Sequence, residues 1–298
     1  MTPPPSGNHR LALVLLLTAP AFWAVNALVA RAAPGHIEPN LLALLRWFIA
    51  GLLFALPARA ELWTHRAHLR EQAWRYLLLG ALSMWICGAW VYIAGRTTSA
   101  VNITLIYTAS PVLIALMSVI WLRERLNARQ GLGIAIALAG VTHVTIQGQW
   151  SALSSVVWVA GDAWIVACAC AWALFSVLLR RWQSPLSVMA RLAAICGAGC
   201  LVIAPFAAYE LWTAKGTAIT SQGFGLAVLA ALLPGYAAFF MNALLQRELG
   251  AARAGLVLYL TPLYSAALAW ALLGEQLQAF HAVGAFMVMG GLFLVSRR

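Results

Sequence analysis

Charged side chains are scarce in this sequence of 298 residues, of which 9% are charged and eight are acidic. A soluble domain has about 25% charged and about 45–50% apolar residues, whereas 63% of this chain is hydrophobic. There is too little polar surface to cover a water-soluble globule. The composition therefore excludes an ordinary soluble domain and predicts an all-α integral membrane protein with the lipid bilayer as its surroundings.

Motifs of common enzyme classes are also missing. The sequence has no glycine-rich phosphate loop ending in Gly-Lys, no His-Glu-x-x-His and no Gly-x-Ser-x-Gly. Its five cysteines lie within apolar stretches, without His or acidic residues at ligand spacing, which favours buried, inert thiols over a metal site or disulfide. We therefore expect no catalytic residues, no metal and no cofactor.

The formal net charge of +11 could indicate a nucleic-acid-binding protein, but the basic residues are dispersed in short gaps between apolar stretches. A nucleic-acid-binding protein gathers them on one face or tail. Alternate gaps hold fourteen arginines, and the remaining gaps hold only Arg31, Arg96 and Lys215. Because Lys and Arg are enriched in cytoplasmic loops, this pattern predicts cytoplasmic N and C termini and no nucleic-acid partner.

Ten apolar stretches can be drawn along the chain, and each predicts a transmembrane helix because a membrane span must satisfy its own backbone hydrogen bonds. They are approximately 11–31, 41–58, 74–95, 98–122, 130–147, 157–180, 186–209, 223–246, 252–273 and 279–296. The first stretch could be a cleaved signal peptide. Its apolar run continues for about 20 residues, enough to span a bilayer, so we expect a retained helix.

An internal repeat divides the chain into residues 1–149 and 150–298. An offset of 151 aligns Pro111 with Pro262. The other aligned pairs are Glu124 with Glu275, Gly133 with Gly284, Gly140 with Gly291 and, at an offset of 149, Trp23 with Trp172. Each copy contains five stretches, an odd number, so the second copy enters the membrane from the opposite side. The sequence thus predicts two inverted five-helix repeats, an architecture that recurs in transporters.

These features resemble the drug/metabolite transporter (DMT) superfamily, specifically its EamA-type ten-helix exporters. The resemblance rests on the proline-centred stretches that end at Glu124 and Glu275, the Trp23 and Trp172 segments, and the doubled Gly-x6-Gly pairs. Within the family, the chain looks most like the YddG-type exporters of aromatic and other amino acids. The resemblance implies export of small metabolites by alternating access through a central cavity.

Pro111 and Pro262 are candidate hinges, because each is placed about halfway along its stretch and removes a backbone hydrogen bond there. A static packing kink is the alternative. Glu124 and Glu275 are candidate gates, or else solvated helix ends. No Asp or Glu lies at the centre of a stretch. Since proton-coupled carriers usually hold an ionisable relay in the membrane, we expect transport without obligatory ion coupling.

Candidate substrate-binding residues are the polar and aromatic side chains placed deep in the stretches. Buried Tyr and Trp need partners for their polar atoms, and together they suit a cavity for amphipathic solutes. The candidates are Trp23, Asn26, Trp85, Tyr107, Ser110, Trp164, Tyr236, Tyr259 and Thr261. Each could instead serve packing, and Ser110 and Thr261 could bond the backbone beside the prolines. Arg46 and Arg191, which match in the repeat, are expected to snorkel to an interface and to share one structural role.

The function expected from these features is export of small metabolites, foremost amino acids including aromatic ones, across a bacterial inner membrane. A monomer or a weak homo-oligomer is expected. One alternative is an exporter of amphipathic drugs or quaternary amines, which an acidic residue in the cavity would favour. Two others are an integral-membrane enzyme acting on a lipid-linked substrate and a pore, whose solute flux would not saturate.

Overall fold

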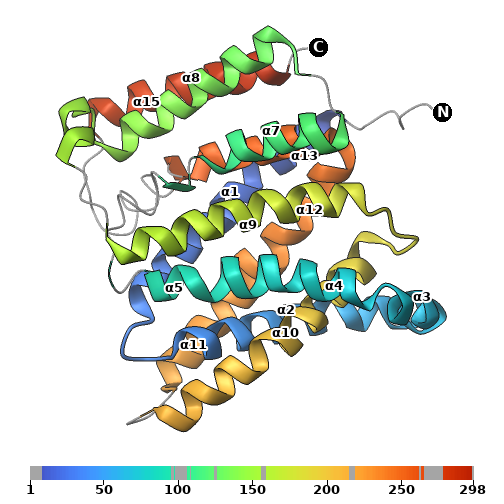
Figure 1. Ribbon diagram of the computed structural model, residues 1–298. Helices are drawn as coiled ribbons and strands as arrows, with labels where there is room; N and C mark the ends of the chain where they lie inside the picture. The colour runs from blue at the N-terminus through green and yellow to red at the C-terminus, as the bar shows by residue number, and fades with distance from the viewer. Residues whose placement is uncertain are drawn as a thin grey trace.

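The computed structural model describes residues 9–94, 97, 106–107, 109–123, 126–155, 159–214, 219–261, 263–264 and 278–296. Within these ranges the chain is helical, apart from turns and one isolated bridge between Ile37 and Ile219 (Figure 1). The elements are α1 His9–Ala32, α2 Pro39–Thr64, α3 Arg66–Glu71, α4 Ala73–Gly80, η1 Ala81–Trp90, α5 Val91–Ala94, α7 Ser110–Leu122, α8 Ala128–Thr145, η2 Trp150–Ser155, α9 Ala160–Arg181, α10 Val188–Thr213, α11 Ser221–Ala230, η3 Ala231–Ala237, α12 Ala238–Leu249, α13 Ala251–Gly255, η4 Leu256–Leu260 and α15 Ala279–Ser296.

Five of the described helical segments are long and apolar enough to cross a membrane. They are Pro39–Thr64, Ala73–Ala94, Ala160–Arg181, Val188–Thr213 and Ser221–Leu249. Three shorter apolar helices cover Val14–Asn26, Ser110–Leu122 and Ala279–Val295. The two remaining stretches contain α8 and α13, so each of the ten has a helix in its described part. The prediction of an all-α chain is confirmed for the described residues.

α8 and α15 pack side by side at one edge of the bundle (Figure 1). A Cβ atom on Gly133 would lie 2.6 Å from the carbonyl oxygen of Gly291, and one on Gly140 would lie 3.0 Å from that of Gly284. The residue order is reversed between the two contacts, so the helices run antiparallel. The absence of side chains at these glycines is what lets the two backbones approach so closely.

α2 and α10 form a second antiparallel pair at the opposite edge, and each caps the start of the other. Near the end of α2, the Glu61 carboxylate accepts hydrogen bonds from the backbone amide and the hydroxyl of Ser187. Near the end of α10, the Glu210 carboxylate accepts from the backbone amides of Asn40 and Leu41 at 2.8 and 3.1 Å. These bonds satisfy amides that a helix start leaves without intrahelical partners.

A π-helical segment interrupts the third and the eighth predicted stretches. η1 begins at Ala81 and η3 begins at Ala231, 150 residues apart. A π-helix shifts the hydrogen-bonding register and frees backbone carbonyls within the helix, and such segments are frequent at functional sites. Both π-helices face α2, whose side chains bond to their carbonyls. Trp47 Nε1 donates to Met84 in η1 at 3.1 Å, and Arg46 Nη2 donates to Pro234 in η3 at 3.2 Å.

Pro111 lies in the first turn of α7 and not halfway along a helix, so the predicted position of this kink was wrong. A turn at Ala109 precedes the helix, and the Ala109 carbonyl accepts a hydrogen bond from Leu113 at 3.0 Å. Proline is tolerated in a first turn, where its missing N–H has no helical partner in any case. Arg123 adopts φ 54° and ends α7 at Leu122, close to the predicted end.

Candidate functional site

The Arg46 guanidinium lies at the centre of a polar network that joins α1, α2, α5 and η3. Its Nη1 donates to Asn26 Oδ1 at 2.9 Å and to the Tyr92 hydroxyl at 3.2 Å. Nη2 donates to the carbonyl of Pro234, inside η3, at 3.2 Å. The Tyr92 hydroxyl in turn donates to Asn26 Oδ1 at 3.0 Å. One cation thus links the two halves of the chain through a backbone carbonyl inside the π-helix η3.

Arg46 is 3% exposed, and its Nε has no hydrogen-bond partner among the described residues. All three of its bonds go to neutral groups. A buried charge is costly unless it is paired and fully hydrogen-bonded. The network therefore holds an arginine whose charge is not neutralised by these contacts and whose donors are not all used.

Aromatic rings pack next to this network. Trp23 on α1 and Trp172 on α9 meet edge to face, with ring centroids 5.6 Å apart. Phe239 on α12 lies 5.5 Å from Trp172 and 4.7 Å from Trp47, again edge to face. The guanidinium of Arg46 lies 4.5 Å from the ring centroid of Trp47. Together these rings form an apolar cluster, contributed by both halves, immediately beside a buried cation.

Trp85 and Trp164 belong to a second aromatic group, centred on Trp90 at the end of η1. Trp90 lies 5.3 Å from Trp85 and 4.8 Å from Trp164, both edge to face. Trp85 also donates from Nε1 to Asn40 Oδ1 at 3.3 Å, and Trp164 is 39% exposed. The structure therefore separates these two candidates from Trp23 and Asn26.

Tyr236 and Tyr107 occupy different surroundings. Tyr236 lies in η3, with its ring 4.6 Å from that of Phe54 and stacked at 6.4 Å on Phe240. Because Pro234 lies two residues earlier in the same π-helix, Tyr236 is close in the chain to the carbonyl that Arg46 uses. Tyr107 lies in the short helical segment 106–107 that precedes α7, and the Arg46 partners given above do not include it.

Ser110, Tyr259 and Thr261 share an unusual property: their hydroxyl oxygens are buried without a hydrogen-bond partner among the described residues. The hypothesis that Ser110 and Thr261 bond the neighbouring backbone is therefore not met in this structure. All three lie where a regular α-helix begins or breaks, since Ser110 opens α7 and Tyr259 lies in the 3-10 helix η4. These three hydroxyls therefore retain unused hydrogen-bonding capacity within the described structure.

The remaining candidates fall outside the described residues. They are Pro262, Glu124 and Glu275.

The two matched arginines do not share one structural role, and the interface position predicted for Arg46 was wrong. Arg46 does not snorkel to an interface, because it is held in the interior by partners from three other elements. Arg191 donates instead to the backbone carbonyl of Trp182, in the connection that leads into α10. Sequence reasoning also missed Tyr92 and the two π-helices. The available signal was the position of Arg46, seven residues after the start of a long apolar helix.

A protein of this kind, built from long apolar helices around a buried polar and aromatic site, belongs to the class of multi-pass membrane transporters. The sequence profile of the EamA-like transporter family matches residues 10–146 and again 159–297. The chain therefore belongs to the EamA-like transporter family of the DMT superfamily.

Individual relatives agree with this assignment. The chain is 26% identical to the uncharacterized transporter YyaM of Bacillus subtilis (strain 168), covering 97% of this chain and 94% of the relative. It is 22% identical to an uncharacterized transporter of Methanothermobacter thermautotrophicus, covering 95% and 85% respectively. One solved crystal structure has the same fold, with a TM-score of 0.76 and 20% identity over 96% of this chain and 97% of that one.

Proposed function

We propose that this transporter exports amino acids, including aromatic ones, or closely similar metabolites across a bacterial inner membrane. The observation that carries the proposal is the buried Arg46, with its unpaired Nε and neutral partners. A guanidinium matches a carboxylate in two parallel hydrogen bonds. A solute carboxylate would neutralise this charge and use its remaining donors.

The neighbouring rings support the aromatic part of the proposal. Trp23 and Trp172 offer edges and faces on which an aromatic side chain can pack, and aromatic pairs contribute about 0.5–1.5 kcal/mol beyond burial. Arg46 of the polar network lies directly against Trp47 of the ring cluster, so the two groups adjoin each other. A solute with a carboxylate at one end and a ring at the other fits this order of groups.

The same cation argues against the alternative of quaternary amines and cationic drugs. A buried guanidinium repels a cationic solute, and its bonds to Asn26, Tyr92 and Pro234 contain no carboxylate that would attract one. We retain anionic or zwitterionic solutes as the substrate class.

For mechanism, we propose alternating access by rocking of two inverted five-helix repeats, 1–149 and 150–298, that together make ten spans with both termini cytoplasmic. Three contacts between the two repeats support it. One joins two aligned residues, and the other two join each glycine of the first repeat to the aligned partner of the other glycine. The contacts are Trp23 with Trp172, Gly133 with Gly291 and Gly140 with Gly284. Pro111 and Pro262 are the proposed hinges, and Glu124 and Glu275 remain the candidate gates.

Transport without obligatory ion coupling is part of the proposal. The six acidic residues in the described ranges lie at or near helix ends: Glu38, Glu61, Glu71, Asp162, Glu210 and Glu248. None of these six is at the middle of a long apolar helix, where proton relays of carriers are placed.

Transport by the purified chain in proteoliposomes tests the proposal. Radiolabelled phenylalanine, leucine, lysine and choline would be compared, with and without proton and sodium gradients. We expect saturable uptake and counterflow of phenylalanine and leucine in the absence of an ion gradient. Accumulation only under an imposed gradient would contradict uncoupled transport, and choline flux without amino-acid flux would contradict the substrate class.

A further inference from the structure

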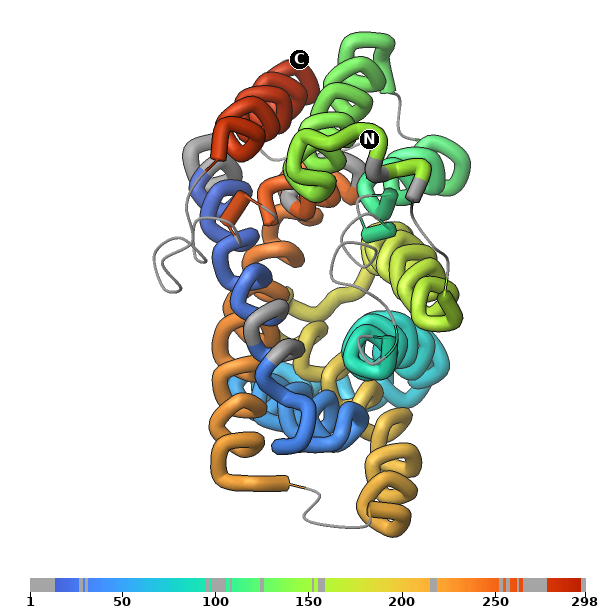
Figure 2. Tube along the Cα trace, turned by 90° about the vertical axis from the view of Figure 1, so that its left-hand side faces the viewer, coloured from blue at the N-terminus to red at the C-terminus, as the bar shows by residue number. Residues whose placement is uncertain are grey.

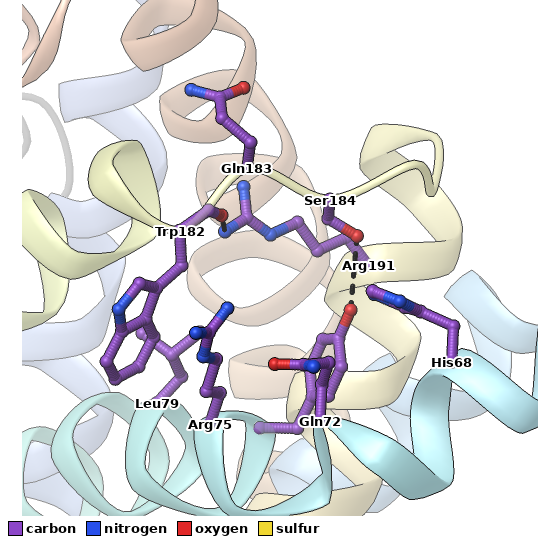
Figure 3. Close-up of a pocket in the computed structure, with 9 residues that line it drawn as sticks. His68, Gln72, Arg75, Leu79, Trp182, Gln183, Ser184 and Arg191 are labelled. Atoms are coloured by element: carbon purple, nitrogen blue, oxygen red, sulfur yellow. Dashed lines mark hydrogen bonds between the residues drawn. The ribbon is translucent and has the colours of Figure 1, made fainter.

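A second site lies away from the Arg46 network, at the end of the bundle where α4 and α10 begin (Figure 1). A small pocket opens there between α4, the end of α3 and the connection from α9 to α10 (Figure 3). It is lined by His68, Gln72, Arg75, Tyr76, Leu79, Trp182, Gln183, Ser184 and Arg191. None of these nine lining residues, all within the described ranges, is acidic.

Two arginines face this pocket with hydrogen-bonding capacity left over. Arg75 lies against two rings, with its guanidinium carbon 5.4 Å from the centroid of Trp74 and 5.3 Å from that of Trp182. Arg191 donates from Nη2 to the Trp182 carbonyl. The Nε atoms of Arg75 and Arg191 are both buried without a hydrogen-bond partner in the described part of the chain. Figure 3 shows both guanidinium groups pointing into the same space.

The frame around the arginines is fixed by hydrogen bonds. The hydroxyls of Tyr76 and Ser184 bond at 3.1 Å, which ties the connection before α10 to α4. Ser184 Oγ also accepts from the backbone amide of Leu186 at 3.3 Å. The pocket is therefore formed by helices and a tethered connection, so the two cations are held near each other before any ligand arrives.

The position of the pocket matches the membrane–water interface. Trp63 and Trp74, at this same end of the bundle, are 71% and 56% exposed, as expected for the tryptophan belts that form at headgroup level. Arg66 lies over the ring of Trp63 at 4.8 Å. Phosphate groups of lipids lie at this depth, and basic pockets between transmembrane helices on the cytoplasmic side bind such headgroups.

We infer that the pocket lined by Arg75 and Arg191 is a binding site for a phosphate group. Two guanidinium groups without an acidic neighbour in the lining provide the planar, charge-assisted donors that phosphate oxygens accept. Gln72 Oε1, buried and unpartnered, suits a hydroxyl of the bound group. The phosphate can come from an anionic phospholipid of the membrane or from free phosphate in solution.

The test uses the purified full-length chain in an uncharged detergent. Thermal unfolding would be followed while phosphatidylglycerol, phosphatidylcholine or inorganic phosphate is titrated. We expect saturable stabilisation by phosphatidylglycerol and none by phosphatidylcholine, which identifies the lipid as the source. Saturable stabilisation by inorganic phosphate would identify the free anion instead. Stabilisation by neither phosphatidylglycerol nor phosphate would overturn the proposal.

Variants assign the effect to the pocket. Arg75→Gln keeps every backbone contact described here and should weaken the stabilising ligand about fivefold, the effect of one cation near a charged surface. Arg66→Gln removes the same charge at the same end of the bundle but outside the lining, and should leave the affinity unchanged. Equal loss in both variants would show a general surface-charge effect and would overturn the site. Because Arg75→Gln leaves the Arg191 bond to Trp182 intact, a folded protein is expected for the measurement.

Discussion

The indole rings of Trp23 and Trp172 meet edge to face, with their centroids 5.6 Å apart. The two residues are 149 positions apart and occupy matching places in the two copies of the repeat. Both family-profile matches, 10–146 and 159–297, contain one of them. The contact therefore lies where the two halves of the chain meet, next to the buried guanidinium of Arg46. Figure 2 shows α1, in blue, running beside the orange segments of the second half, which include α12.

Replacing Arg46 by Gln should reduce transport of amino acids strongly while leaving the protein folded. Losing one partner of a buried charge-assisted contact costs about 2–5 kcal/mol, and we expect the loss to fall on the solute-bound state. Saturation kinetics in proteoliposomes would show kcat/KM reduced by about 30-fold or more. Arg46→Lys keeps the charge but loses the two parallel donors of the guanidinium. Its kcat/KM should therefore lie between those of the wild type and Arg46→Gln. Unchanged kinetics in Arg46→Gln would contradict the proposal that Arg46 binds the solute carboxylate.

Trp23→Leu should change solute preference more than total activity. The variant keeps an apolar side chain but loses the ring edge and face, which are worth about 0.5–1.5 kcal/mol to an aromatic partner. The ratio of phenylalanine to leucine transport should fall by about 2- to 10-fold. Trp212→Leu, at a position that is 84% exposed, is the matched control and should not alter the ratio. A similar fall in the control would point to a non-specific effect.

Gly291→Ala should destabilise the pair formed by α8 and α15. The new Cβ would lie 2.4 Å from the Gly133 carbonyl oxygen and 2.7 Å from the amide nitrogen of Ala137, so the helices must move apart at a cost of about 1–3 kcal/mol. Gly290→Ala is the control, because its Cβ would meet no atom within 4 Å. Thermal unfolding should show a lower Tm for Gly291→Ala, and an unchanged or higher Tm for Gly290→Ala.

Pro111→Ala separates a hinge from a passive helix start. Since Pro111 lies in the first turn of α7, the change removes no hydrogen bond and should alter stability by less than about 1 kcal/mol. If the segment before α7 bends during transport, the maximal rate should fall while KM for the solute changes little. A variant with wild-type rate and wild-type Tm would assign Pro111 to packing alone.

Much of the helical arrangement could be predicted from the sequence, because hydropathy and the spacing of Gly, Trp and Pro are properties of the sequence itself. The stretches containing α9 and α10 were placed to within four residues at both ends, whereas α2 continues six residues beyond its predicted end. The position of Pro111 was wrong because hydropathy does not distinguish a continuous apolar helix from one preceded by a turn. A break of this kind depends on the backbone hydrogen bonds around Ala109, which tertiary packing decides.

The site was predicted less completely, since the meaning of a polar residue depends on which helices surround it. Asn26 was singled out as a polar residue in an apolar helix, but its partners Arg46 and Tyr92 come from other elements. The carbonyl that Arg46 uses belongs to Pro234, inside the π-helix η3. No spacing rule predicts that irregularity.

The reciprocal caps at Glu61 and Glu210 also impose an order on assembly. When α2 leaves the ribosome, the amides of Asn40 and Leu41 have no carboxylate to which they can donate, because Glu210 lies 170 residues further along than Asn40. When α10 emerges, Glu61 has already been made, and Ser187 can bond to it at once. The start of α2 therefore stays uncapped during much of synthesis, whereas the partner that caps α10 is synthesised before α10 itself. Completion of α10 brings Glu210 to the start of α2, which is therefore capped last.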